Sequence, residues 1–191
     1  MPADASETRF ERVLSACVRR IEPLAARVLG RRPIRNVLHA RACRAWQATD
    51  APLIVCYGNI NRSPFAEQLA RRRPGSGASS AGLYLKAGRP SPPLTITVAA
   101  THGVDLHEHR SVILGRELID NTPAIFIFDL DNLARIAVRH PAALRKTYFL
   151  GALANSGDPL IADPHGCGED VLEDVLTQIE RAVDHVMQAR D

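Results

Sequence analysis

Apolar residues are spaced differently on the two sides of residue 51 in this 191-residue chain. Before that point they recur at steps of three and four, which predicts helix over residues 6–48 with a break near Gly30–Pro33. One apolar stripe is formed by Val13, Cys17, Ile21, Leu24 and Val28. Pro23 falls inside this pattern and is expected to kink or split the helix.

The helical segment is interpreted as an extension that packs on the main domain or on a second subunit. Residues 1–50 hold ten arginines and five acidic residues, whereas the rest of the chain holds 14 basic and 16 acidic residues. A helix lying on a membrane surface is the less favoured alternative, because the stripe is rich in Ala and Val rather than in aromatic residues. Nucleic acid is not expected as a partner, since the only aromatic residues of the segment are Phe10 and Trp46.

From residue 51 onwards, short apolar runs alternate with helical periods. The runs predict strands over residues 52–56, 79–83, 124–128 and 147–150. The periods predict helices over residues 64–73, 94–102, 132–139 and 169–189. Strands that alternate with helices predict an α/β fold in three layers, in which a four-stranded parallel sheet is flanked by helices.

Composition narrows the class of protein. Hydrophobic residues make up 46% of the chain, which is enough for a buried core. No stretch approaches the roughly 18 consecutive apolar residues of a membrane span, and the first residues lack the basic-then-apolar order of a secretory signal. The four cysteines, at positions 17, 43, 56 and 167, form no C-x-x-C pair. A reduced, cytoplasmic protein without a transmembrane segment is therefore expected.

The sequence CYGNINRSP, residues 56–64, links the first predicted strand of the main domain to its first helix. Open α/β sheets bind ligands at the carboxyl ends of their strands, and the N–H groups of a loop and a helix N-terminus favour an anion there. Those groups and the Arg62 cation favour the thiolate form of Cys56. Arg62 also offers a fork for two phosphate oxygens, and the Ser63 hydroxyl can donate to the sulfur. Cys56 is therefore predicted to be a nucleophile that faces a phosphoryl group; a buried, inert cysteine is the alternative.

A phosphate ester also requires an acid that protonates its leaving group. Asp163 is the candidate, because it lies in the Pro- and Gly-rich segment IADPHG, just before the last predicted helix, from where a carboxyl group can reach over the loop. An aspartate that simply begins a turn before Pro164 is the alternative interpretation.

These motifs carry a resemblance to a known family. VCYGNINRSP, residues 55–64, resembles the phosphate-binding loop of the low-molecular-weight protein tyrosine phosphatases. Further segments follow in the family's order: Ser80–Gly82, His102–Gly103 with His109–Arg110, Phe128–Asp129, and Asp163–Pro164. The resemblance covers residues 52–189, which implies a phosphatase domain over residues 51–191 and an Arg-rich helical extension over residues 1–50. It also implies the flavodoxin-like fold of the phosphotyrosine phosphatase I type.

The resemblance assigns roles to individual residues. Cys56 resembles the nucleophile that forms a phosphocysteine, Arg62 the phosphate-binding arginine, and Ser63 the hydroxyl that stabilises the thiolate leaving group. Asp163 resembles the general acid that later activates water. Structural support is implied for four residues around the loop: Asn59 in a left-handed conformation, Ser80 and His109 bracing it, and Asp129 as a buried acid.

Substrate contacts are expected from the loop and from residues that face it, namely Tyr57, Gly58, Asn59, Ile60, Asn61, Tyr84, Leu85 and His165. The resemblance implies no metal and no cofactor. It implies a phosphotyrosine-containing protein as substrate and partner, such as an autophosphorylating tyrosine kinase of the kind linked to exopolysaccharide production in the bacterial branch of the family.

Two positions depart from the family pattern, and a third, Ile60, bears on the substrate. Asn61 stands where the family has a second cysteine that traps the oxidised nucleophile as a disulfide, so Cys56 is expected to oxidise further unless another thiol resolves it. Cys167 is a hypothetical resolving thiol. His165 follows Asp-Pro where the family places an aromatic clamp. Ile60 favours an apolar ring beside the phosphate, and it argues for phosphotyrosine because similar members acting on phosphoarginine have Thr there.

Two other functions are kept as alternatives. A thiol-dependent arsenate reductase on the same fold requires two further cysteines after the third strand, and residues 129–141 contain none. A phosphate-binding module without turnover is disfavoured by the complete set of Cys56, Arg62, Ser63 and Asp163.

Overall fold

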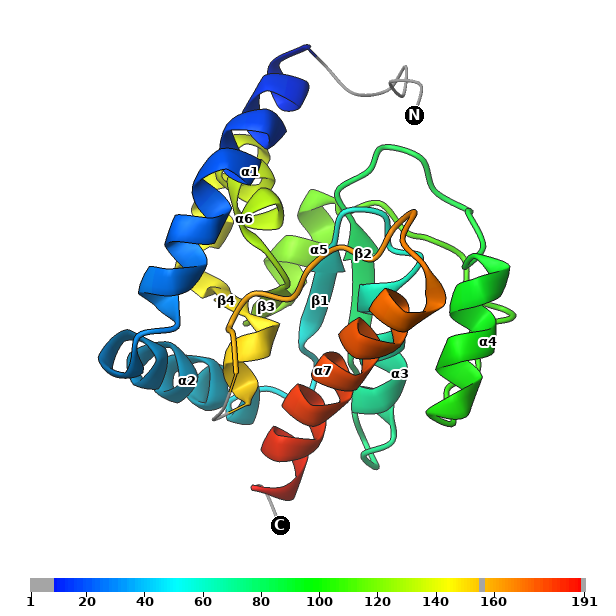
Figure 1. Cartoon of the computed structure of the whole chain (residues 1–191). Coiled ribbons are helices and arrows are strands. Elements are labelled where there is room, and N and C mark those ends of the chain that lie inside the picture. The colour runs from blue at the N-terminus through cyan, green and yellow to red at the C-terminus, as the bar shows by residue number, and fades with distance from the viewer. Residues whose placement is uncertain (1–8, 155–156, 190–191) are drawn as a thin grey trace.

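The centre of the molecule is a four-stranded parallel sheet (Figure 1). The computed structural model describes residues 9–154 and 157–189. Its strands lie in the order β2-β1-β3-β4 and comprise β1 (Leu53–Cys56), β2 (Ser79–Gly82), β3 (Ile125–Ile127) and β4 (Thr147–Phe149). All three strand pairs are parallel, so the predicted α/β architecture is confirmed.

Seven α-helices and two short 3-10 helices are found in the described residues. The α-helices are α1 (Arg9–Leu29), α2 (Arg32–Gln47), α3 (Arg62–Arg71), α4 (Pro93–Thr101), α5 (Arg116–Asn121), α6 (Leu130–Arg139) and α7 (Glu169–Gln188). The 3-10 helices are η1 (Pro141–Lys146) and η2 (Leu150–Leu153). Helix α5 was not predicted, and α3 begins two residues earlier than predicted. Residues 6–8 of the first predicted helix lie outside the described residues.

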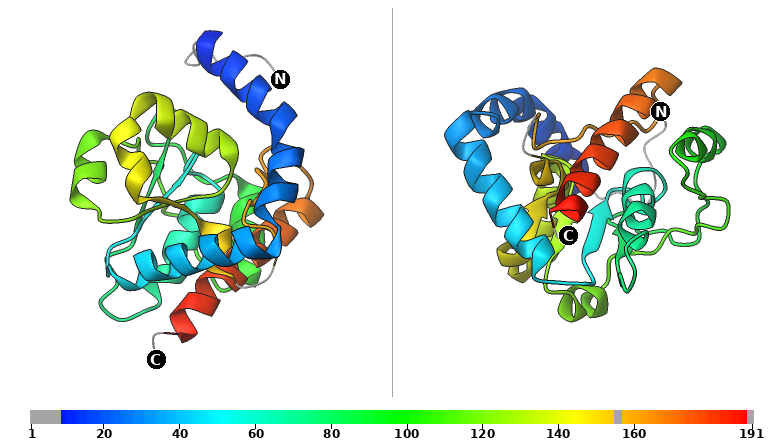
Figure 2. Two further views of the ribbon diagram at one scale, coloured as in Figure 1. Left: turned by 90° about the vertical axis from the view of Figure 1, so that its left-hand side faces the viewer. Right: turned by 90° about the horizontal axis from the view of Figure 1, so that it is seen from below.

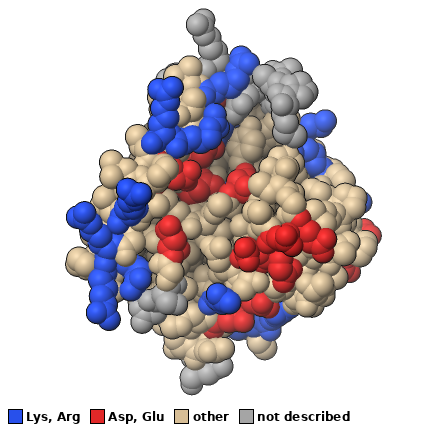
Figure 3. Space-filling model, in the orientation of Figure 1, with Lys and Arg blue, Asp and Glu red and all other residues tan. Residues whose placement is uncertain are grey.

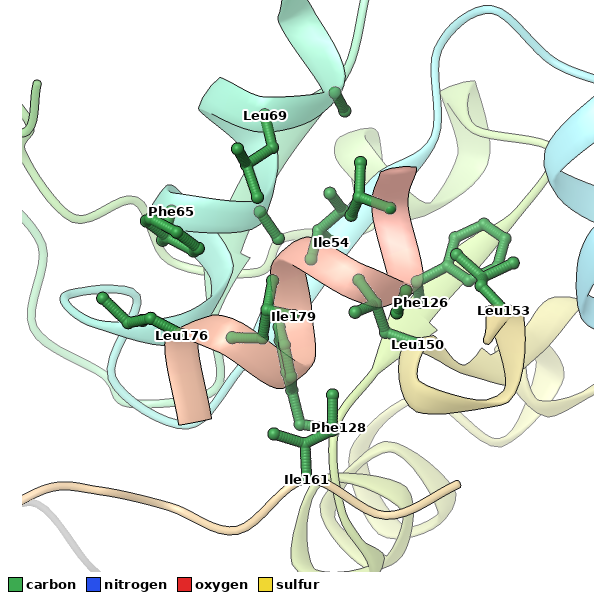
Figure 4. Close-up of a cluster of buried hydrophobic side chains, with 14 of the residues drawn as sticks. Ile54, Phe65, Leu69, Phe126, Phe128, Leu150, Leu153, Ile161, Leu176 and Ile179 are labelled. Atoms are coloured by element: carbon green, nitrogen blue, oxygen red, sulfur yellow. The ribbon is translucent and has the colours of Figure 1, made fainter. Parts of the chain in front are cut away.

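Helices cover both faces of the sheet because consecutive strand residues point to opposite sides. One face buries Ile54 and Phe126 against α2, α3, α7 and η2 (Figure 4). The other face buries Val55 and Ile127 against α5, α6 and η1. Cys56 lies on the first of these two faces, at the end of the central strand β1. Its position is therefore fixed by a strand that is buried on both sides.

Helix α2 packs on the domain through several residues, of which Trp46 is the largest. Trp46 is 2% exposed and contacts the edge of Phe126 on β3, with the ring centroids 4.9 Å apart. Edge-to-face pairs of this kind add to the free energy gained by burying the rings. The second half of the predicted extension therefore packs on the main domain.

Helix α1 packs beside α6, and it does so through polar residues (Figures 1 and 2). Glu11, Ser15 and Val18 are buried in this contact. The apolar stripe is turned away from the domain: Val13, Ile21 and Leu24 are between 56% and 66% exposed, and Cys17 is exposed. The helix also continues through Pro23, so of the two expectations the split was wrong, and a kink at Pro23 stays a prediction.

Basic side chains gather along the edge formed by α1 and the start of α2 (Figure 3). They include the exposed residues Arg12, Arg19, Arg20, Arg27, Arg31 and Arg32. Within the described part of the chain, no helix combines the length and the apolar character needed to cross a membrane.

Candidate active site

The candidate site lies where β1 ends and α3 begins (Figure 1). Cys56 is the last residue of β1, residues 57–61 form the loop, and Arg62 is the first residue of α3. The loop packs closely on the end of the neighbouring strand. A Cβ atom added to Gly82 would lie 3.0 Å from Asn59 Cβ and 3.1 Å from the carbonyl oxygen of Tyr57. Only glycine allows β2 to support the loop at this distance.

The Cys56 sulfur is buried among hydrogen-bond donors. The residue is 3% exposed, its Sγ lies 3.0 Å from Ser63 Oγ, and the Asn59 backbone N–H donates to it over 3.2 Å. Arg62 and Ser63 form the first turn of α3, whose N-terminal N–H groups carry a partial positive charge. The surroundings of the sulfur therefore favour negative charge.

Asn59 holds the loop in its conformation. Its φ of 51° is the left-handed value that was predicted, and it is the only non-glycine residue of the described chain with positive φ. Its side-chain Nδ2 donates to Ser63 Oγ at 2.9 Å and to Ser80 Oγ at 2.8 Å. Its Oδ1 accepts from the Val112 backbone N–H at 2.8 Å, and its carbonyl oxygen accepts from His109 Nε2 at 2.7 Å. The structure thus places Ser80 and His109 as braces of Asn59.

The hydrogen bonds also orient the Ser63 hydroxyl. Because Asn59 Nδ2 has only hydrogens to give, Ser63 Oγ must accept from it. The Ser63 proton is then available to the Cys56 sulfur 3.0 Å away. A hydroxyl in this position stabilises a sulfur that carries negative charge.

Arg62 is a fully buried cation at the edge of the loop. Its Nη1 donates to Asp129 Oδ2 at 2.6 Å and to the Ile161 carbonyl at 3.0 Å, while Nη2 lies 2.8 Å from Asp163 Oδ2. Burial alone would lower the pKa of the guanidinium, but Asp129, Asp163 and Cys56 more than offset this and raise the pKa. Within the described part of the chain, its buried Nε has no hydrogen-bond partner and remains able to donate to an anion.

Asp129 positions Arg62 through a buried ion pair. It follows β3 and caps α6, where its Oδ1 accepts from the Asn132 backbone N–H at 2.7 Å. Burial raises the pKa of the Asp129 carboxyl group, and Arg62 and the capping hydrogen bond offset only part of this rise. The buried acid expected near the site is therefore present, in contact with Arg62.

Asp163 reaches the site from the segment before α7. Its side chain is 41% exposed while one carboxylate oxygen contacts Arg62. The other oxygen, Oδ1, accepts from the His165 backbone N–H at 3.2 Å. The carboxyl group thus lies at the mouth of the site, where it is accessible both to solvent and to a bound molecule.

A pocket opens above the sulfur and has aromatic walls. The Tyr57 and Tyr84 rings have their centroids 5.7 Å apart. The lining residues are Cys56, Tyr57, Gly58, Ile60, Asn61, Arg62, Tyr84, Arg89, Asp163 and His165. Most of the expected substrate contacts are therefore brought together. Leu85 is not, because its side chain is 53% exposed and does not line the pocket. Asn59 is fully buried within the loop and does not line the pocket either.

Three residues with roles at the site were missed by the sequence analysis. Arg89 lines the pocket, donates from Nη2 to the Gly58 carbonyl at 2.5 Å and lies over the Tyr84 ring at 4.2 Å. Glu67 accepts from Ser80 Oγ at 2.5 Å. Thr95 donates to Asn61 Oδ1 at 2.8 Å. No local pattern marks any of them, since each acts through a contact far along the chain.

The positions of Cys56 and Cys167 are relevant to the hypothesis that Cys167 resolves an oxidised Cys56. Cys167 is a free, exposed cysteine four residues after Asp163, and its side chain does not line the pocket. Cys56 is a free, buried cysteine at the floor of the pocket. A resolving role for Cys167 stays a prediction.

The sequence of the main domain matches those of known proteins. Residues 52–190 match the family described as low molecular weight phosphotyrosine protein phosphatase. A protein of Ralstonia nicotianae, named as the probable low molecular weight protein-tyrosine-phosphatase EpsP, is 37% identical over 133 residues, which are 69% of this chain and 90% of that protein. The match leaves the first 51 residues of this chain outside the family's range.

Solved structures show the same fold. The tyrosine phosphatase Wzb from Escherichia coli K30, in complex with sulphate, superposes with a TM-score of 0.68 and 27% identity, covering 74% of this chain and 99% of that chain. The YwlE arginine phosphatase from Geobacillus stearothermophilus superposes with a TM-score of 0.66 and 29% identity, covering 73% and 92% of the two chains.

Proposed function

Since this chain belongs to the low molecular weight phosphotyrosine protein phosphatase family, a family of phosphoric monoester hydrolases, we propose that it hydrolyses phosphotyrosine in proteins through a phosphocysteine intermediate. The observation that carries the proposal is the position of the Cys56 sulfur. It lies at the floor of the pocket, between the Ser63 hydroxyl and the Asn59 N–H, and Arg62 lines the same pocket.

In the first step, the Cys56 sulfur attacks phosphorus and forms an S–P bond while the bond from phosphorus to the tyrosine oxygen breaks. The loop N–H groups and the Nε and Nη2 of Arg62 hold the phosphate oxygens as charge develops on them. Asp163 donates its proton to the departing phenolate oxygen. A bound phosphate competes with Asp163 for Arg62 Nη2, which frees the carboxyl group for this transfer.

In the second step, the Asp163 carboxylate takes a proton from a water molecule that attacks the phosphocysteine. The S–P bond breaks, inorganic phosphate leaves, and the bonding electrons return to the Cys56 sulfur as a thiolate. The Ser63 hydroxyl donates to that thiolate and so stabilises it as a leaving group. The enzyme is then restored for another cycle.

Phosphotyrosine fits the walls of the pocket. The Tyr57 and Tyr84 rings and the Ile60 side chain flank the space above the sulfur, and they suit a flat aromatic ring attached to the phosphate. A second candidate substrate is phosphoarginine, because the chain is also similar to an arginine phosphatase. The partner is proposed to be a phosphotyrosine-containing protein, such as an autophosphorylating tyrosine kinase.

Turnover of p-nitrophenyl phosphate and of a phosphotyrosine peptide tests the proposal. Cys56→Ser is expected to abolish both activities, because a hydroxyl in this position is a far weaker nucleophile than a thiolate. Cys17→Ser is the matched control, since Cys17 is exposed on α1, and it is expected to keep full activity. Turnover that survives in Cys56→Ser, or that is missing in the parent, would contradict the proposal.

The substrate class is tested by parallel assays with phosphotyrosine, phosphoserine and phosphoarginine peptides of one sequence. We expect the highest kcat/KM for phosphotyrosine, because its ring can pack against the Tyr57 and Tyr84 rings that line the pocket. Equal values for all three peptides, or a higher value for phosphoarginine, would remove this part of the proposal.

A further inference from the structure

Helix α1 contacts a network of charged residues that ends at the wall of the pocket. Ser15 of α1 donates from Oγ to Asp131 Oδ1 at 2.5 Å and accepts from Arg135 Nη2 at 2.6 Å. Arg135 Nε in turn contacts Asp131 Oδ2 at 2.6 Å. Ser15 and Arg135 are 6% and 3% exposed, and the Asp131 side chain is 25% exposed, so most of the network is shielded from solvent. One hydroxyl group from α1 thus bridges the two residues of a partly buried ion pair of α6.

The far side of Arg135 is in contact with the pocket. Its guanidinium lies over the Tyr57 ring, 4.4 Å from the centroid. Tyr57 follows the Cys56 nucleophile directly and lines the pocket. A buried cation over a tyrosine ring restricts both the position and the tilt of the ring. Ser15 therefore reaches a wall of the pocket through only one intervening side chain.

A second contact from α1 runs in parallel with the first. Glu11 is 6% exposed and forms an ion pair with Arg139 of α6. Arg139 also donates from Nη1 to the carbonyl oxygen of Leu83. Leu83 directly precedes Tyr84, whose ring also lines the pocket and lies beside that of Tyr57, with the centroids 5.7 Å apart. Both aromatic walls are thus connected to buried polar residues of α1.

The groups that would bind the phosphate depend on other contacts. Cys56 and Arg62 are held by Asn59, Ser63, and Asp129. None of these residues belongs to α1 or is bonded to Ser15 or Glu11 in the contacts described above. Another residue of α1, Glu22, interacts electrostatically with Asp129 and Arg62 and is left unchanged in the test. The loss of the Ser15 or Glu11 contacts is therefore expected to affect the binding of a ring and to leave the binding of a phosphate nearly unchanged.

We propose that α1 helps to shape the substrate-binding pocket. Ser15 and Glu11 are positioning residues that hold Arg135 and Arg139. Through these two arginines they keep the Tyr57 and Tyr84 rings in the arrangement that accepts an aromatic phosphate ester. The inference rests on the proposed function, because it concerns the ring that the substrate presents. It gives the first helix, which lies outside the range of the family match, a role in specificity.

The test compares calorimetric binding of benzylphosphonate, which has a ring, with that of inorganic phosphate, which has none. In Ser15→Ala the affinity for benzylphosphonate is expected to fall about five-fold. The variant loses the hydrogen bond to Arg135, and Arg135 in turn contacts the Tyr57 ring that faces the ligand. The affinity for phosphate is expected to stay within about two-fold of the parent. Val13→Ala, on the exposed face of the same helix, is the matched control and is expected to change neither.

A double-mutant cycle separates positioning from a general loss of stability. In a Tyr57→Ala background, Ser15→Ala is expected to have no further effect on benzylphosphonate, since the ring through which the contact acts is gone. If Ser15→Ala does not fold, Glu11→Gln is judged by the same comparison of the two ligands. The inference would be overturned if the variant kept the parent's ratio of affinities for benzylphosphonate and phosphate, either because neither affinity changed or because both fell equally. A parent that does not hydrolyse phosphotyrosine would instead count against the proposed function.

Discussion

The side chain of Asn59 makes three hydrogen bonds in a loop that carries the nucleophile, and Asn59→Ala removes all three. Buried hydrogen bonds of this kind contribute about 1 kcal/mol each, so their loss costs about 3 kcal/mol. Alanine is also disfavoured at the φ of 51°, which adds about 1 kcal/mol. We therefore expect the free energy of unfolding to fall by about 4 kcal/mol.

Urea unfolding followed by fluorescence measures this loss, because Trp46 is the only tryptophan and is buried against β3. Asn59→Gly is the informative comparison: it loses the same hydrogen bonds but tolerates positive φ, so it should be more stable than Asn59→Ala by about 1 kcal/mol. Alkylation of Cys56 by iodoacetamide, followed by mass spectrometry, should be slower in both variants, because the Asn59 N–H no longer holds its position beside the sulfur. A loss below about 1.5 kcal/mol, or equal stability of the two variants, would refute the reasoning.

Three further changes give expected outcomes. In Gly82→Ala the new methyl group meets the loop backbone, so kcat for p-nitrophenyl phosphate and stability against urea should both fall. Gly115→Ala is the control: a methyl group there meets open space, so neither quantity should change. Arg62→Lys should lower kcat by about 100-fold, since an ammonium group cannot replace the guanidinium fork. Burial and nearby carboxylates raise the pKa of Glu22 above its ordinary 4.5, so the native state binds more protons than the unfolded state and this group's contribution to stability falls as the pH rises through that window. Glu22→Gln should therefore gain stability against urea relative to the parent as the pH rises above 4.5, and a difference between the two proteins that does not change with pH would contradict this.

The sheet and the central residues of the site could be predicted because the sequence patterns that indicate them lie within short segments. Apolar runs bounded by turns mark the four strands, and each run lies within two residues of the strand found. Cys56, Arg62 and Ser63 are joined by a short loop between a strand and a helix, so their spacing alone brings them together. Asp129 and Asp163 lie far along the chain. Asp163 was expected at the site from its Pro- and Gly-rich segment before the last helix, whereas Asp129 was expected only through the family resemblance.

The packing of α1 could not be predicted in the same way. Periodicity shows which side of a helix is apolar, but it does not show which side has a partner. Glu11 and Ser15 pair with residues that lie more than 110 positions away, and these polar contacts determined which face was buried. Arg89 and Thr95 escaped notice for the same reason, since their partners in the loop lie about thirty positions away. Helix α5 is only six residues long, too short for a period to be recognised.

The hydrogen bond from Thr95 to Asn61 has a consequence for how this loop can change during evolution. Both side chains are buried, and each satisfies the other. A single exchange of Asn61 for cysteine would leave the Thr95 hydroxyl without its acceptor inside α4. We therefore expect Asn61→Cys to cost stability when made alone, and to cost less when Thr95→Val removes the hydroxyl at the same time.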